Sequence, residues 1–260
     1  MTLAVDFSKK SLVIVTGASQ GIGQTIAIEI SKCLVPNSKI ILIARSASGL
    51  STTKELIFNV NKEITVETIS LDLTKPTLEE CSNILNGEYD VQQAIIFHNV
   101  GQIGKLSKSV NLTDLQLWRD YFDLNVFSVS ILNAVLVTGL KGKVEKLYVV
   151  NITSLCAKVP FGNMTLYGAG KAAREQYFRV FALEEKDVVV LNYSPGPVDT
   201  QMVDEIIDSC ESNELRDEFV TLRESKKILL PNQTVEKLLS ILKLGIFKSG
   251  DVIDYYDRNV

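Results

Sequence analysis

The sequence is poor in the residues on which many enzyme classes depend. It contains one histidine, His98, among 260 residues. A metal site built from several histidines is therefore excluded, and a histidine-dependent catalytic triad would have to use His98. The four cysteines are widely spaced and form no Cys-x-x-Cys pair. We therefore expect no metal site, and the cysteine pattern is typical of a protein of the reducing cytosol.

Strong charge and long hydrophobic runs are also missing. A net charge of -4 and a pI near 5.3 argue against nucleic acid or an anionic membrane surface as a partner. No uninterrupted apolar run approaches 18 residues, and the first residues lack the pattern of a signal peptide, so we expect a cytoplasmic protein without a membrane span. Since no linker or repeat divides the chain, we expect one domain over residues 1–260.

Short β-rich runs alternate with amphipathic stretches along the chain. Continuous apolar strands between helices predict an α/β fold in which a parallel sheet is covered on both faces. We expect strands at 11–16, 39–44, 65–71, 94–98, 147–152, 188–193 and 252–255. We expect helices at 21–34, 49–60, 112–140 (bent near 123–126), 165–184 and 234–244, with a polar, helix-like stretch after Pro195 up to 227.

The stretch from 147 to 200 carries a candidate catalytic group. Ser154 follows an apolar strand, and Tyr167 and Lys171 lie four residues apart, which places both on one face of a helix. A cation beside a phenol, whose ordinary pKa is about 10, favours the phenolate and lowers that pKa. A tyrosine tuned in this way exchanges a proton with a carbonyl or alcohol oxygen, which the Ser154 hydroxyl would hold in place.

The first predicted strand ends in the glycine-rich sequence TGASQGIG. Gly17 would make a tight turn, Gly21 would let the backbone approach a pyrophosphate, and Gly23 would let the helix pack closely. Such a segment can also be an ordinary turn between a strand and a helix. Its position after the first strand and at the start of a helix favours dinucleotide binding.

The end of the second strand bears on the choice of nucleotide. It reads Ala44-Arg45-Ser46 and has no carboxylate for a ribose 2′-hydroxyl. A guanidinium suits a 2′-phosphate, although Arg45 could also be a solvated loop charge. At the end of the third strand, Asp72 and Leu73 could contact the adenine, or Asp72 could cap the turn that follows. The sequence leaves these alternatives open.

Together, these motifs resemble the short-chain dehydrogenase/reductases, and the resemblance covers nearly the whole chain. It implies a single-domain Rossmann fold with a doubly wound parallel sheet of strand order 3-2-1-4-5-6-7. The matching segments, in order, are TGASQGIG, Asp72-Leu73, Asn99-Val100-Gly101, Asn125, Ser154, Tyr167-x-x-x-Lys171 and Pro195-Gly196.

The resemblance also implies roles for single residues. Tyr167 would donate the proton, Ser154 would orient the carbonyl, and Lys171 would bind the nicotinamide ribose as well as tune Tyr167. Asn125 would hold a helix bend and a proton-relay water. A homodimer is implied, paired through the long helices that carry Asn125 and Tyr167.

The implied cofactor is NADPH. His98 departs from the family pattern Asn-Asn-Ala-Gly and is expected to pack behind the Asn99–Gly101 turn. Gln20 stands where close relatives carry arginine, so NADPH preference would depend on Arg45, Ser19 and backbone groups. The implied cofactor contacts are Gly17, Ala18, Ser19, Gln20, Gly21, Ile22, Gly23, Ala44, Arg45, Asp72, Leu73, Asn99, Gly101, Tyr167, Lys171, Pro195, Val198, Asp199, Thr200, Gln201 and Met202.

Segments 151–157, 166–174, 182–202 and 247–257 are similar to the sepiapterin-reductase group of this family. That similarity makes Asp254 the anchor of a pterin, whose N3–H and 2-amino group a carboxylate can accept side by side. Met164 replaces a tryptophan of the group. The implied substrate contacts are Ser154, Leu155, Tyr167, Gly196, Met202 and Asp254, with Cys156 and Phe161 as further candidates, a lid over about 198–227 and an anchoring strand over 250–257.

The expected function is NADPH-dependent reduction of pterin side-chain ketones, namely sepiapterin and 6-pyruvoyl-tetrahydropterin, in tetrahydrobiopterin biosynthesis. One alternative is a carbonyl reductase of the same fold that acts on other diketones or quinones. Another is a non-catalytic NADP(H)-binding regulator. The intact set of Ser154, Tyr167 and Lys171 argues against the regulator, which would need none of them.

Overall fold

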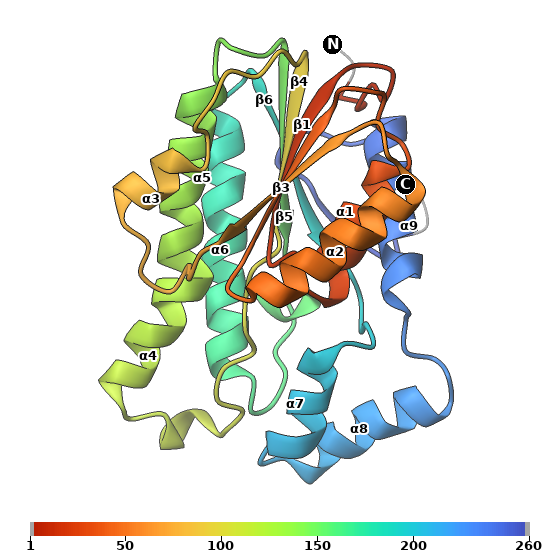
Figure 1. The fold of residues 1–260 in the computed structure, drawn as a ribbon. Coiled ribbons are helices and arrows are strands. Elements are labelled where there is room, and N and C mark those ends of the chain that lie inside the picture. Colours follow the sequence, from red (N-terminus) through yellow and green to blue (C-terminus); the bar gives the residue numbers. More distant parts are fainter. Residues whose placement is uncertain (1–2, 258–260) are drawn as a thin grey trace.

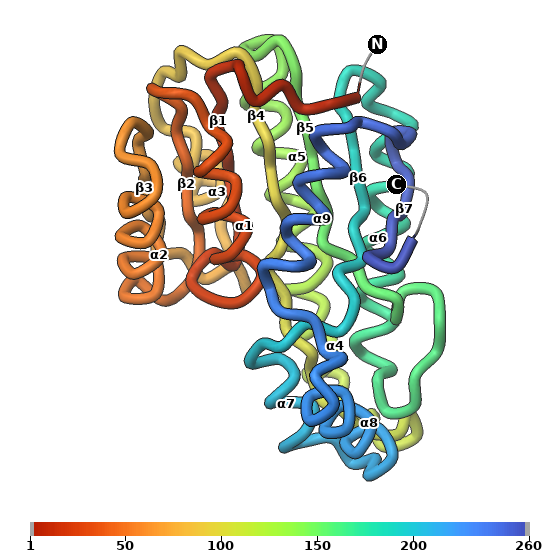
Figure 2. Tube along the Cα trace, turned by 90° about the vertical axis from the view of Figure 1, so that its right-hand side faces the viewer, coloured from red at the N-terminus to blue at the C-terminus, as the bar shows by residue number. Residues whose placement is uncertain are grey.

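The computed structural model describes residues 3–257, which form a parallel sheet with helices on both faces. Figure 2 shows the strand order β3-β2-β1-β4-β5-β6-β7, which confirms the predicted Rossmann fold. The strands are β1 (Ser11–Thr16), β2 (Lys39–Ala44), β3 (Thr65–Ser70), β4 (Gln93–His98), β5 (Lys146–Ile152), β6 (Val188–Ser194) and β7 (Val252–Asp254).

Helices cover both faces of the sheet because successive side chains of a strand point to opposite sides. Val13 and Val15 of β1 pack in one hydrophobic cluster, and Leu12 and Ile14 pack in the other. Helices α1 (Gly21–Ser31), α2 (Ala47–Val60) and α9 (Pro231–Leu244) cover the first face (Figure 1). Helices α3 (Leu78–Asn83), α4 (Leu115–Phe122), α5 (Ser128–Leu140) and α6 (Thr165–Glu184) lie on the second.

Several helices differ from their predicted ranges by two or three residues at one end, with α2 and α9 beginning at Ala47 and Pro231 rather than at 49 and 234, and one short helix was not predicted. Helix α1 ends at Ser31 rather than at position 34, a few residues before Pro36, which cannot continue a helix. Helix α3 was not predicted. Its six residues begin at a capping box, in which the Thr77 hydroxyl accepts from Glu80 N and the Glu80 carboxylate accepts from Thr77 N.

The predicted bend in the long helical stretch is a π-helical segment, η2 (Asp123–Phe127), between α4 and α5. The stretch Leu115–Leu140 is long and apolar enough to cross a membrane by composition, although the sequence shows no unbroken apolar run of that length. More than half of its most apolar window is buried, and Leu132 and Leu136 belong to the core beneath the sheet. It is therefore a core helix of the domain.

After β6 the chain leaves the sheet and forms α7 (Gln201–Ser209) and α8 (Asn213–Glu224), which lie beyond the carboxyl ends of the strands (Figure 1). Two backbone bonds close the base of this segment, from Leu229 N to Pro197 O (2.9 Å) and from Asp199 N to Leu229 O (2.8 Å). The α7–α8 segment, residues 198–229, spans the range predicted to cover the substrate.

Candidate active site

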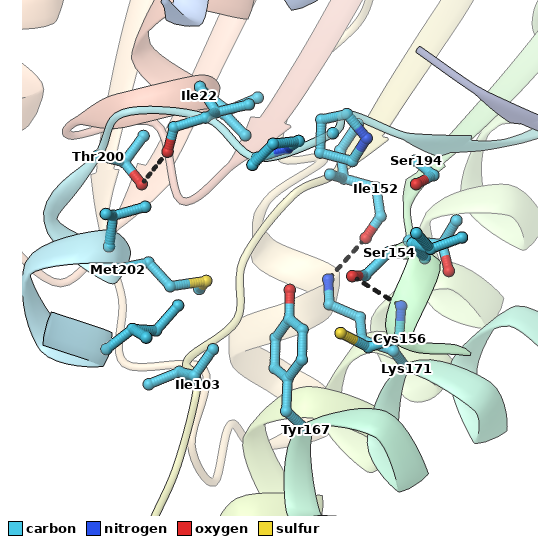
Figure 3. A pocket seen from close by; sticks show the side chains of 18 of the residues that line it. Ile22, Ile103, Ile152, Ser154, Cys156, Tyr167, Lys171, Ser194, Thr200 and Met202 are labelled. Atoms are coloured by element: carbon cyan, nitrogen blue, oxygen red, sulfur yellow. Dashed lines mark hydrogen bonds between the residues drawn. The ribbon is translucent and has the colours of Figure 1, made fainter. Parts of the chain in front are cut away.

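A cavity of about 300 Å³ lies at the carboxyl ends of β4, β5 and β6 (Figure 3). Parallel strands with helical crossovers place their functional loops at this edge. Helix α6 and the α7–α8 segment complete its walls. The predicted site residues that line it are Ile22, Asn99, Gly101, Ser154, Leu155, Cys156, Phe161, Met164, Tyr167, Lys171, Pro195, Gly196, Val198, Thr200, Met202 and Asp254.

Tyr167 lies in the first turn of α6 and is buried, with its hydroxyl directed toward the cavity (Figure 3). Burial raises the pKa of Tyr167 above its ordinary value, while a hydrogen bond with Ser154 and the charge of Arg174 act in the opposite direction. The spacing of Tyr167 and Lys171 predicted a lowered pKa for Tyr167; this prediction is wrong, because desolvation of the buried phenol has the larger effect. The phenol is therefore protonated at neutral pH, as an ordinary tyrosine is, and burial makes it a weaker acid than a free phenol.

Lys171 lies one helical turn after Tyr167, as the spacing of four predicted. Its ammonium is 5.6 Å from the centre of the Tyr167 ring and donates to Ile152 O at 2.8 Å (Figure 3). Burial lowers the pKa of Lys171 well below its ordinary value, and the charge of Arg174 adds to this effect. A neutral lysine amine has two donors and an ammonium has three, so in either state the bond to Ile152 leaves a donor for a ligand in the cavity.

Ser154 follows β5 and begins the short 3₁₀ helix η3 (Leu155–Ala157). Its hydroxyl oxygen accepts from Cys156 N at 3.2 Å (Figure 3). That bond fixes the oxygen without using the hydroxyl hydrogen. Ser154 can therefore donate to an acceptor in the cavity.

Asn125 lies in the π-helical segment, where its amide links two parts of the site. Its Oδ1 accepts from Gln102 N at 2.9 Å, and its Nδ2 donates to Tyr121 O at 2.9 Å. Asn125 therefore ties the helix bend to the loop after β4. It is buried and does not line the cavity.

The glycine-rich turn packs closely against the start of α1 and the end of β4. Gly17 has φ +66°, a conformation that favours glycine, and a Cβ on Gly23 would lie 2.2 Å from Gly17 O. Asn99 Nδ2 donates to Thr16 O (3.1 Å) and Gly17 O (3.3 Å), which joins this turn to the end of β4. The backbone geometry thus fits the predicted phosphate cradle.

The residues predicted to bind the adenosine half lie outside the cavity, along the same edge of the sheet. Arg45 is exposed after β2. Asp72 Oδ1 accepts from Thr74 N (2.9 Å) and Thr74 Oγ1 (2.7 Å), and these bonds lower the pKa of Asp72. Of the alternatives left open for Asp72, the turn contact is therefore present. The predicted residues outside the cavity lining are Gly17, Ala18, Ser19, Gln20, Gly21, Gly23, Ala44, Arg45, Asp72, Leu73, Asn125, Asp199 and Gln201.

Asp254 ends β7, which pairs with β6 and brings the carboxylate to the cavity wall. Its Oδ2 accepts from Ser194 Oγ at 2.5 Å, and its Oδ1 accepts from Tyr256 N at 3.0 Å. These two hydrogen bonds fix the orientation of the Asp254 carboxylate. Because a carboxylate oxygen accepts more than one bond, each can still accept from a ligand.

His98 packs behind the Asn99–Gly101 turn, as expected. It is fully buried, with its ring centre 5.3 Å from that of Phe178, and Nε2 lies 3.1 Å from Asn133 Oδ1. Burial lowers its pKa to about 3, so the ring is neutral. His98 does not line the cavity.

Sequence reasoning missed Arg174 and part of the cavity lining, which also includes Ile103, Val203, Ile206 and Tyr256. Arg174 is buried beneath the cavity, and Phe219 and Leu222 of α8 line its outer wall. Arg174 could have been found, because Tyr167, Lys171 and Arg174 have the i, i+4, i+7 spacing of one helix face. The α8 residues carry no comparable signal.

Comparison with known proteins decides the family. The model of the short chain dehydrogenase family matches residues 11–211. The chain is a short-chain dehydrogenase/reductase. It is therefore an oxidoreductase of a family that uses nicotinamide cofactors.

Members of this family that are similar to the chain act on different carbonyl compounds. Sepiapterin reductase of Xenopus tropicalis is 35% identical over 251 residues, covering 95% of this chain and 96% of that protein. Benzil reductase ((S)-benzoin forming) of Bacillus subtilis is 26% identical over 251 residues, covering 94% and 97%. A short chain dehydrogenase from Escherichia coli, crystallised with NADPH, shares the fold with a TM-score of 0.76 at 23% identity, covering 98% of this chain and 99% of that one.

Proposed function

We propose that this short-chain dehydrogenase/reductase reduces the side-chain ketone of a pterin with NADPH. The substrates would be sepiapterin, which has one side-chain ketone, and 6-pyruvoyl-tetrahydropterin, which has two. The latter gives tetrahydrobiopterin only after both ketones are reduced, with one NADPH and one proton used for each. The observation that carries the proposal is the position of Asp254 on the same cavity as Ser154 and Tyr167. Similarity to sepiapterin reductase over 95% of the chain supports it.

The catalytic end would work through three side chains. When bound, the nicotinamide supplies a hydride to the carbonyl carbon. Tyr167, which is protonated at neutral pH, donates its proton to the carbonyl oxygen, which the Ser154 hydroxyl orients. Lys171 has a donor left beyond its bond to Ile152 and holds the nicotinamide ribose. Asn125 keeps the helix bend that supports this arrangement and would hold the relay water.

The substrate end would recognise the pterin ring. Asp254 would accept the N3–H and the 2-amino group, because both of its oxygens keep acceptor capacity. Apolar side chains of Met202, Phe219 and Leu222 would cover the ring, so the α7–α8 segment acts as the lid. A volume of about 300 Å³ lies at the lower end of the range for ligand sites.

NADPH fits the other end of the site. The turn at Gly17 and Gly23 provides the phosphate cradle, and Arg45 is exposed where the 2′-phosphate would lie. Gln20 Nε2 donates to Gln201 Oε1 at 2.7 Å, which joins the glycine-rich turn to the first residue of α7. Cofactor binding and the lid would therefore be linked.

A homodimer in the cytoplasm completes the proposal. Exposed apolar side chains lie on the two helices expected at the interface, with Phe127 51% and Ile131 42% exposed on or next to α5 and Leu183 68% exposed on α6. Sedimentation analysis should give a particle of two chains. A monomer at micromolar concentration would contradict this part.

Oxidation of NADPH with sepiapterin, measured beside diacetyl, tests the proposed substrate. We expect turnover of sepiapterin at a kcat/KM well above that of diacetyl. Turnover of diacetyl or benzil with none of sepiapterin would instead favour a diketone reductase, the second candidate, which the similarity to benzil reductase supports. No turnover of either, with NADPH bound, would favour the non-catalytic regulator.

A further inference from the structure

Arg174 is a buried cation next to the catalytic helix face. It is 1% exposed and lies on α6, seven residues after Tyr167 and three after Lys171. Among residues 3–257, no carboxylate forms an ion pair with it. The adjacent Glu175 instead accepts from Thr153 Oγ1 at 2.9 Å. A buried charge without a counter-ion is costly, so its hydrogen bonds must account for its presence.

The guanidinium of Arg174 donates in three directions. Its Nε donates to Asn151 Oδ1 at 2.6 Å, and its Nη1 donates to Val100 O at 2.7 Å. Its Nη2 donates to His98 O. The carbonyls of His98 and Val100 lie on either side of Asn99, where the chain leaves the sheet at the end of β4. The planar fork of arginine holds three acceptors in fixed directions, which an ammonium cannot reproduce.

The segment that Arg174 holds forms the cavity wall on the cofactor side. Asn99 and Gly101 line the cavity, and Asn99 also donates to Gly17 O in the glycine-rich turn. A shift of this segment would therefore move both the turn and the wall. Arg174 links them to the helix that carries Tyr167 and Lys171.

The same network continues toward the substrate end. Asn151 Nδ2 donates to Asn192 Oδ1 at 2.9 Å, and Asn192 Nδ2 donates to Gly250 O at 3.3 Å. Asn192 N donates to Asp251 O at 3.0 Å, just before the strand that ends in Asp254. Buried polar groups thus connect the ends of β4, β5 and β6 to the start of β7.

We propose that Arg174 is a positioning residue that holds the Asn99–Gly101 segment in register with α6 and so sets the nicotinamide against Tyr167. This inference rests on the proposed roles of Tyr167 and Lys171 and is independent of the pterin substrate. The charge of Arg174 also opposes the rise that burial causes in the pKa of Tyr167. The positioning role, in contrast, follows from the three hydrogen bonds that the guanidinium donates.

The test compares Arg174→Lys and Arg174→Gln with Arg179→Gln, a control on an exposed position of the same helix. NADPH affinity is measured by fluorescence, and turnover is measured with sepiapterin and with diacetyl. We expect both Arg174 variants to lose about tenfold in NADPH affinity and about a hundredfold in kcat, the cost of misplacing a reacting group by an ångström. The KM for the carbonyl substrate should change little.

A kinetic isotope effect separates positioning from loss of stability. With NADPH deuterated at the transferred position, the effect on kcat should increase in both Arg174 variants, because a misplaced nicotinamide makes hydride transfer the slow step. A folded variant with wild-type NADPH affinity, kcat and isotope effect would overturn the proposal. Complete rescue by lysine but not by glutamine would also overturn it, since charge alone would then explain the effect.

A third variant keeps the test decisive if neither substitution folds. Asn151→Ala removes one acceptor and leaves Arg174 bonded to the two carbonyls, so a smaller loss of kcat, about threefold, is expected. An unchanged kcat and isotope effect in this variant would contradict the proposal. NADPH binding without any turnover by the wild-type protein would refute the proposed function while leaving the affinity comparison valid.

Discussion

The catalytic end and the substrate end of the cavity are built from different kinds of structure. Tyr167 and Lys171 are buried on α6 and backed by the Arg174 network. The lid, by contrast, combines a buried apolar cluster with an ion pair between Arg223 and Asp199 that is about one-third exposed on both sides. Buried hydrogen bonds fix the first region, and apolar packing with partly exposed ion pairs holds the second.

We propose that this difference gives the two ends separate tasks. Buried groups with fixed partners suit a proton transfer that needs constant geometry, whatever the carbonyl compound. A lid on the surface can change its side chains without disturbing the sheet, so it suits the selection of a substrate. Changes at the catalytic end should therefore affect all substrates, and changes at the other end should affect them unequally.

Removal of the Tyr167 hydroxyl should produce the largest effect. Tyr167→Phe keeps the ring and removes the proton donor. The kcat should therefore fall about 10²–10⁴-fold or more, for sepiapterin and diacetyl alike. NADPH affinity, measured by fluorescence titration, should stay nearly unchanged. Retention of more than about a tenth of the wild-type rate would remove Tyr167 from the role of donor.

Asp254→Asn should separate the two ends. It replaces one acceptor oxygen with a donor that would face a pterin N–H. The transition state for sepiapterin should therefore be destabilised by about 2–4 kcal/mol, measured as a fall in kcat/KM. Diacetyl has no such edge and should be turned over at almost the wild-type rate. An equal loss for both would mean that Asp254 supports the fold, through its bonds to Ser194 and Tyr256.

Arg45→Asp tests cofactor choice. Loss of a charge-assisted contact to the 2′-phosphate should raise the KM for NADPH about ten- to a hundredfold, with further repulsion from the new carboxylate. The KM for NADH should change little, because NADH lacks that phosphate. Equal changes for both cofactors would show that Arg45 acts on the structure of the loop.

The smallest effect is expected from Arg223→Gln. Arg223 donates to Asp199 at 2.6 and 3.0 Å and pairs with Asp204 at 2.9 Å, but solvent screens these contacts. The KM for sepiapterin should rise about two- to fivefold with kcat unchanged, in line with a partly exposed ion pair. Arg216→Gln, on the same helix, is the control. A fall in kcat with no change in KM would contradict a role for Arg223 in holding the lid.

The regions differ also in how far the sequence predicts them. The strands, the bend at Asn125 and the spacing of Tyr167 and Lys171 follow from local patterns, and the structure confirms their positions. Resemblance placed Asp254 at the cavity, which periodicity alone could not do, since it lies nearly 90 residues after Tyr167. Local patterns and matched motifs therefore recover most of the catalytic end.

Tertiary effects account for what was missed. The direction of the Tyr167 pKa depends on the depth of burial, which spacing does not give. The pairing of Arg223 with Asp199 spans 24 positions, and nothing local distinguishes these charges from other surface charges. The proposed role of Arg174 depends on the carbonyl groups of His98, at the end of β4, and of Val100, in the loop that follows, which the sequence of α6 does not reveal.

The most direct test of a cavity with a catalytic end and a substrate end is a crystal structure with NADP⁺ and sepiapterin bound. We expect the ketone oxygen at about 2.6–3.2 Å from the hydroxyls of Tyr167 and Ser154. We also expect the pyrimidine edge of the pterin to lie on the Asp254 carboxylate. A pterin bound in the reverse direction, or with its ring away from Asp254, would contradict the proposed roles of the two ends.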